Sequence, residues 1–328
     1  MSYNSFSRPR FYTNTIEYLY NKGYVTSSID SIFLSSNWHR PKNIEETLFS
    51  VEFSSSTMLA DINYILFMGC SDSTSISIDL DNDATSIHNL NDNTNNDTDS
   101  NPDSGRNINT YSSAYGKTSF IIMGVAENEF FGKSQIDITV TGDISGICVG
   151  NYFDVPYNPD LGIKKTISYE GNNTIDSVGG KTFSFRYGDS KPYNPFSNTL
   201  QGSEVPYDET AQIISSQNNI PTGRRSYELS YSYIGSSSDN QNHLFPRDFN
   251  YSNDMANLSE SLEYESSKQN LYTSVINKTI GSHIPFIFSL NGSESNELMI
   301  ARFTNKSFQA TEKAPNVHNI SLGIREVW

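Results

Sequence analysis

Short segments in which apolar and polar residues alternate recur along most of the chain. The segment "TSISIDLD" places Ile76, Ile78 and Leu80 at every second position, with serine or aspartate between them. Because successive side chains of a β-strand point to opposite faces, this spacing predicts a strand with one buried and one solvent-facing side. The same alternation appears in "TLFSVEFS", "QIDITVTG" and "RRSYELSYSYIG". Such a chain is predicted to be mainly β.

Two further patterns complete the predicted architecture. The runs "YILFMGC" and "GICVG" are almost entirely apolar, as is typical of strands buried on both faces. One helical segment is predicted at 254–277, where Leu258 and Leu262 lie four residues apart and recur on one helix face. The fold class that follows is mainly β, with two β-sandwich-like modules and one helical segment in the C-terminal half.

The length of 328 residues exceeds the usual size of one domain and predicts two. We assign residues 1–44 to an N-terminal arm, residues 45–155 to a first β-sandwich and residues 156–328 to a second β-rich domain. The segment "NYFDVPYNPD" is interpreted as the hinge between the modules, because Pro156 and Pro159 restrict its backbone.

Two long segments are predicted to be loops. Residues 81–113 are rich in Asn and Asp and nearly devoid of large apolar side chains, which predicts an exposed acidic loop. Residues 188–223 contain four prolines and are predicted to be an extended loop. Asp79, Asp81 and Asp83 alternate as calcium ligands do. A calcium loop would require glycine and glutamate where this chain has alanine and leucine, so a solvated acidic loop is favoured.

Charge and cysteine content exclude several classes of protein. The net charge of −15, with Lys and Arg clustered only in pairs such as Lys164–Lys165, argues against nucleic-acid binding. The sequence has no apolar run long enough to span a membrane and no signal-peptide core, so we expect a protein released into the cytosol. Cys70 and Cys148 lie in apolar runs and are expected to be buried thiols, with a disulfide between neighbouring strands as the alternative.

Catalytic signatures are missing from the sequence. The five histidines are dispersed, and the chain contains no GxSxG, GxxxxGK[ST] or GxGxxG motif. Gly179-Gly180 followed by Lys181 is interpreted as a tight turn rather than a phosphate loop, because no helix follows it. The pairs Asp154/Asp160 and Glu127/Glu129 leave a hydrolytic carboxylate pair as a minor alternative. We therefore expect no enzymatic activity, no cofactor and no metal.

Aromatic residues in segments rich in Pro and Asn are the candidate interaction residues. A tyrosine ring packs against a partner while its hydroxyl remains hydrated, which suits protein interfaces and sugar binding alike. Protein contacts are the favoured interpretation. The candidate interface residues are Tyr152, Tyr157, Tyr193, Phe196 and Tyr207.

Several segments follow one another in a distinctive order: "INYILFMGC", "GICVGNYFDVPYNPD", "SVGGKTFSF", "RRSYELSYSYI", "GSHIPFIFSL" and "IREVW". Their order resembles a type of tailed-bacteriophage tail structural protein with tandem β-sandwich modules, found at the minor tail, baseplate or fibre-attachment region. One departure is Gly69-Cys70-Ser71, which stands where such proteins have a Gly-His-Asn-like turn.

The resemblance implies a structural virion component of the tail, assembled in the host cytoplasm and without enzymatic activity. Its partners would be other virion tail proteins and further copies of itself in a symmetric ring, held by protein–protein contacts. The alternative is a carbohydrate-binding β-sandwich in which loop aromatics contact a host surface glycan.

Overall fold

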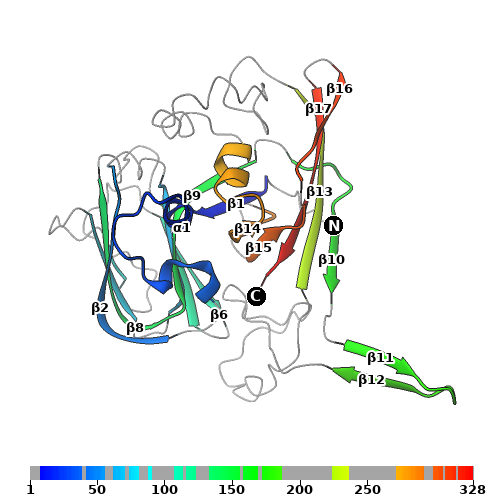
Figure 1. Cartoon of the computed structure of the whole chain (residues 1–328), viewed down its shortest axis with the longest axis horizontal. Coiled ribbons are helices and arrows are strands. Elements are labelled where there is room, and N and C mark those ends of the chain that lie inside the picture. Colours follow the sequence, from blue (N-terminus) through cyan, green and yellow to red (C-terminus); the bar gives the residue numbers. More distant parts are fainter. Residues whose placement is uncertain are drawn as a thin grey trace.

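The structure of this chain is a computed structural model, and it describes residues 8–38, 42–55, 62–70, 74–80, 88–90, 107–113, 116–122, 133–155, 158–168, 172–186, 224–235, 271–291, 298–305, 307–314 and 317–327. Within these residues the strands form three antiparallel sheets (Figure 1). The prediction of a mainly β chain is confirmed.

The largest sheet has 11 strands and runs through the whole molecule. Its order is β10-β13-β17-β15-β14-β1-β9-β3-β7-β6, with β16 also beside β17. The strands are β1 (Arg10–Asn14), β3 (Tyr64–Cys70), β6 (Asn107–Ser113), β7 (Gly116–Ile122), β9 (Gly146–Asp154), β10 (Lys164–Ser168), β13 (Arg224–Gly235), β14 (Phe286–Ser289), β15 (Met299–Phe303), β16 (Ala310–Ala314) and β17 (Val317–Glu326).

A four-stranded sheet lies opposite one end of the large sheet, on the left in Figure 1. It contains β2 (Lys42–Glu52), β8 (Gln135–Ile144), β4 (Ser75–Leu80) and β5 (His88–Leu90), in that order. Apolar residues of both sheets meet in a first core, as alternation in each sheet predicts. Representative members are Ile78 and Ile138 from one sheet and Phe67 and Val149 from the other.

A second core lies on the part of the large sheet formed by β13, β17, β15 and β14. It is rich in aromatic rings, among them Phe11, Phe286 and Phe303. The π-helical turn η3 (Tyr272–Asn277) covers it and contributes Val275, preceded by Leu271. Of the predicted helix at 254–277, only 271–277 lies within the described residues.

The N-terminal segment is built into the body of the molecule. Strand β1 pairs with β9 on one side and with β14 on the other. Helix α1 (Thr15–Lys22) follows directly, and two 3-10 turns, η1 (Ser31–Phe33) and η2 (Ser35–Asn37), come next. The large sheet thus contains strands from all three segments predicted as 1–44, 45–155 and 156–328, and the division into domains stays a prediction.

Helix α1 was not predicted, although its start carries the Asn-x-x-Glu pattern of a helix N-terminus. The side chain of Asn14 accepts a hydrogen bond from the backbone N–H of Glu17, and its amide donates to the Glu17 carboxylate. That carboxylate also accepts hydrogen bonds from Ser35. An Asn with Glu three residues later is the sequence signal for this start. Burial raises the pKa of Glu17.

The predicted acidic loop 81–113 contains two strands, β5 and β6, so the structure corrects that part of the expectation. Among the described strands β6 pairs only with β7, and it forms an edge of the large sheet. An edge strand gains its hydrogen bonds from one neighbour through its backbone, which a polar sequence such as "NINTYSS" provides without an apolar pattern. The predicted loop 188–223 lies outside the described residues.

Strand β1 depends on the absence of a side chain at Gly150. A Cβ there would overlap the carbonyl oxygen of Thr13, so we expect Gly150→Ala to lower the free energy of unfolding by about 1–3 kcal/mol. Gly162→Ala is the matched control, because no atom lies within 4 Å of its added Cβ. Urea denaturation measures both, and equal stability of the two variants would contradict this role of Gly150.

Candidate functional site

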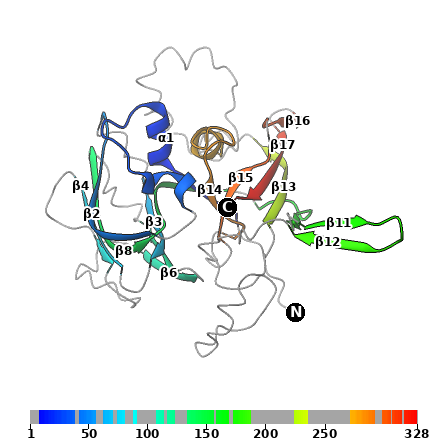
Figure 2. The same cartoon turned by 60° about the horizontal axis from the view of Figure 1, so that its bottom comes forward.

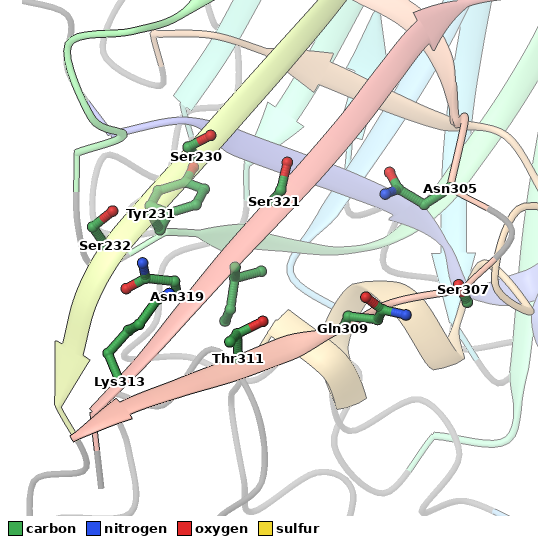
Figure 3. A pocket seen from close by; sticks show the side chains of 11 residues that line it. Ser230, Tyr231, Ser232, Asn305, Ser307, Gln309, Thr311, Lys313, Asn319 and Ser321 are labelled. Atoms are coloured by element: carbon green, nitrogen blue, oxygen red, sulfur yellow. The ribbon is translucent and has the colours of Figure 1, made fainter. Parts of the chain in front are cut away.

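A polar groove crosses the face of β13, β17 and β16 that points away from the second core (Figure 3). Its volume is about 600 Å³. Hydroxyl and amide side chains dominate the lining. We call this site the polar groove, and its residues are Ser230, Tyr231, Ser232, Asn305, Ser307, Gln309, Thr311, Lys313, Asn319, Ile320 and Ser321.

Strand register places the polar side chains on one face. Ser230 pairs with Ser321, and Thr311 pairs with Asn319, so these residues share a face of the sheet. Tyr231 and Ile320, one position along each strand, belong to the second core on the opposite face. The sequence "SYELSYSYIG" already predicted this alternation, but not which strands would lie beside it.

Strands β15 and β16 both pair with β17. The polar groove lies where the chain moves away from β17 between these two strands. Thr304 donates its N–H to the Gly323 carbonyl, and Gly323 donates its own N–H to the side chain of Asn305, at 2.6 Å. A Cβ at Gly323 would overlap the hydroxyl of Thr304, so glycine permits this close crossing. The residues after Asn305 then form one wall of the groove.

The described lining of the polar groove consists mainly of groups that donate and accept hydrogen bonds. Its lining residues include one charged group, Lys313, and no carboxylate, imidazole or thiol. Ser232 donates a hydrogen bond of 2.7 Å to Asp160 at the rim, but no imidazole links the two as a nucleophile would require. Burial, with the charge of Asp160, raises the pKa of Tyr231, which therefore remains a neutral phenol. The groove offers hydrogen bonds to a neutral polar ligand.

Tyr152 is the predicted interface residue that the structure describes. It lies within strand β9 rather than in a loop, because β9 continues to Asp154. The guanidinium of Arg10 lies 4.5 Å from the centre of its ring and pairs with Asp154 at 2.7 Å. The ring is therefore partly covered by its own chain. The other four candidates, Tyr157, Tyr193, Phe196 and Tyr207, lie outside the described residues.

The candidate carboxylates have separate structural partners. Asp154 pairs with Arg10, while Asp160 accepts hydrogen bonds from Ser232. Glu127 and Glu129 lie outside the described residues, as do Asp81 and Asp83. In the part of the chain that the structure describes, no group of three or more His, Cys, Asp and Glu is arranged to hold a metal ion.

A two-stranded hairpin stands apart from the sheets and projects from the body in both views (Figures 1 and 2). It consists of β11 (Asn172–Asp176) and β12 (Thr182–Arg186), and we call it the hairpin arm. Ile175 and Phe183 are directly opposite one another in the two strands, and each is about half exposed. Val178 in the turn is fully exposed. The arm thus presents three apolar side chains at its surface.

The turn of the hairpin arm is the one predicted at Gly179-Gly180. Gly180 donates its N–H to the Ser177 carbonyl at 2.9 Å and has a φ of 78°, in the left-handed region. This geometry favours glycine and closes the loop between antiparallel strands. The prediction of a tight turn is confirmed. The sequence pattern did not indicate that β11 and β12 would pair with no other described strand.

The best-formed charged cluster of the described residues is buried and fully paired. The guanidinium of Arg225 on β13 donates to both carboxylate oxygens of Glu326 on β17, at 2.9 and 3.1 Å, and to the carbonyl of Leu298. Both side chains are nearly inaccessible to solvent. These charge-assisted hydrogen bonds link β13 to β17. No sequence pattern indicated this pair.

Both cysteines are buried and neither forms a disulfide, so the prediction of buried thiols is confirmed. Burial raises the pKa of Cys70 to about 12. Cys148 lies 3.0 Å from the hydroxyl of Tyr64, and burial raises its pKa further. Burial therefore disfavours the reactive thiolate form of both cysteines. No helix of the described residues is long and apolar enough to cross a membrane.

Comparison with known proteins gave no match: no protein-family model, no curated protein and no solved structure is significantly similar to this chain.

The buried pair predicts a strong asymmetry between single and double substitutions. Arg225→Met leaves the Glu326 carboxylate buried without its partner and is expected to reduce the free energy of unfolding by about 3–5 kcal/mol. Adding Glu326→Leu removes that charge and should recover part of the loss. Lys164→Met is the control, because its ion pair with Glu228 is exposed and contributes about 0–1 kcal/mol. Chemical denaturation that found the double variant less stable than Arg225→Met would contradict this account.

Proposed function

We propose that this chain is a structural component of a phage virion tail that assembles through protein–protein contacts. The proposal unites the resemblance of the segment order to tail proteins with one structural observation. The hairpin arm extends from the body and carries exposed Ile175, Val178 and Phe183 at its surface. Apolar side chains on a projecting element suit a contact with another protein subunit.

The chemistry of the described residues supports an assembly role over catalysis. The charged groups with the closest partners, Arg225 with Glu326 and Arg10 with Asp154, bridge strands of one sheet. The large sheet joins the two cores through neighbouring hydrogen-bonded strands, so both cores share one framework that can present contacts to other subunits. In this proposal the partners are other virion tail proteins and further copies of the chain.

Immunogold electron microscopy tests the location. Antibody against the purified chain should label the tail, baseplate or neck of phage particles from the source culture, because a structural component remains in the finished particle. Antibody preadsorbed with the purified chain is the control. Absence of label on both intact and disrupted particles would reject a virion role.

Glycan binding is the second candidate, and the polar groove is the observation that favours it. Sugars are bound by networks of hydrogen bonds to hydroxyl and amide groups, and Gln309, Thr311 and Asn319 supply such groups on one open face. The one aromatic residue of the lining, Tyr231, belongs to the core. Binding in this groove would therefore rest on hydrogen bonds and not on ring stacking.

A glycan array tests the second candidate. If the polar groove binds a host surface glycan, Gln309→Ala combined with Asn319→Ala should reduce retention at least tenfold, since two hydrogen-bonding amides are lost. Glu45→Gln on β2, a surface change outside the groove, should leave retention unchanged. No retention of the native chain, or equal retention by the groove variant, would exclude glycan binding at this site.

A further inference from the structure

We propose that the hairpin arm docks on the free edge of β10 in a second copy of this chain, and that two copies exchange arms in a two-fold symmetric dimer. This inference rests on the proposed function, assembly through protein–protein contacts, and specifies one partner and one surface for it.

Within the described residues, no third strand pairs with the hairpin arm. Its two strands pair with each other and with no other described strand. Two strands alone are marginally stable in water, and a third strand or a packed layer normally supports them. Ile175, Val178 and Phe183 remain exposed in the single chain. A third strand alongside β11 would supply backbone hydrogen bonds and cover part of this apolar surface.

Strand β10 provides a matching open edge. Among the described strands it pairs only with β13, so its other edge is available for an added strand. It has five residues, the same number as β11. Ile167 on β10 is partly exposed, and Leu161 just before the strand is fully exposed. The edge therefore offers both backbone groups and apolar side chains.

Lysine often protects a strand edge from pairing, but the two lysines of β10 are directed to the neighbouring strand. Lys164 forms an ion pair of 3.2 Å with Glu228, and Lys165 lies 5.7 Å from the ring centre of Tyr227. Both partners belong to β13. These contacts draw the ammonium groups toward β13 and away from the free edge.

Within one chain β11 pairs with β12 and not with β10, and the arm projects away from the large sheet (Figure 1). A second copy can bring the same two strands together. In a two-fold arrangement whose register is centred in the sequence between β10 and β11, β11 of one copy lies antiparallel to β10 of the other. Each copy then uses the same surface, as two-fold interfaces require.

This symmetry fixes the register of the proposed contact. Position 176 lies opposite 164, position 172 lies opposite 168, and the turn residue Val178 comes beside Leu161 of the other copy. Ile167 of one copy and Ile175 of the other then share a sheet face as diagonal neighbours. A single docked arm has fewer residues than the roughly 20–30 a side of a standard interface. Reciprocal exchange contributes both the arm and the receiving edge from each copy.

Cross-linking of single-cysteine variants tests the arrangement. Leu161→Cys and Val178→Cys are made separately in the full chain, mixed, and treated with a short bismaleimide at about 0.15 M salt, where the repulsion between two copies of charge −15 is screened. A covalent dimer is expected in the mixture. The native thiols, Cys70 and Cys148, are buried and do not compete.

Each variant treated alone is the internal control. Two-fold symmetry places the two equivalent residues at opposite ends of the proposed contact, so a short bismaleimide should not join them and neither variant alone should form the dimer. Ile175→Asp should weaken dimerisation at least tenfold in sedimentation equilibrium, because it places a charge in the contact. Leu48→Asp on β2 is the matched control, since Leu48 is also exposed but lies outside the contact.

The outcomes separate this inference from the proposed function. A monomeric chain at all concentrations, no cross-link in the mixture, or equal cross-linking of one variant alone would overturn arm exchange, even where gold label marks the phage tail. A cross-link in the mixture with unlabelled particles would leave arm exchange standing and remove the virion role.

Discussion

The insertion of β1 between β9 and β14 is the constraint on which the rest of this structure depends. The backbone of Thr13 approaches β9 at Gly150, where a Cβ would overlap its carbonyl oxygen. The same carbonyl accepts a hydrogen bond of 2.9 Å from the buried hydroxyl of Tyr64. One short strand thereby supplies backbone hydrogen bonds to both neighbours and turns two separate sheet edges into the interior of one sheet.

That continuity determines where the molecule remains open. Because β1 joins the middle of the large sheet, the described strands of that sheet with one paired neighbour are β6, β10 and the side strand β16, which pairs with β17. The hairpin arm is attached immediately after β10. Among the described strands, a hairpin that pairs with no third strand and a strand with one neighbour therefore follow one another in the chain. The polar groove has a different origin. It forms where the segment after β15 moves away from β17, next to the hydrogen bond from the Gly323 N–H to the side chain of Asn305.

Sequence reasoning worked where one residue pattern has one physical meaning. Alternating residues such as Ile76, Ile78 and Leu80 became a strand of the four-stranded sheet, and Gly179-Gly180 became a turn. It failed where an outcome depended on a distant partner. Tyr152 was expected in a loop because prolines follow it, yet pairing with β1 extends β9 to Asp154. Strand β6 was expected to be loop because it is polar, yet β7 supplies its backbone partners.

The sequence by itself determined the mainly β class, the faces of the alternating strands, the burial of both cysteines and the turn of the hairpin arm, because each follows from local spacing and from transferring apolar groups out of water. Tertiary structure alone decided the strand order, the pairing of Arg225 with Glu326, the polar groove and the isolation of the hairpin arm. These features depend on which strands become neighbours. Neighbours separated by 101 positions, as Arg225 and Glu326 are, leave no local trace in the residues between them.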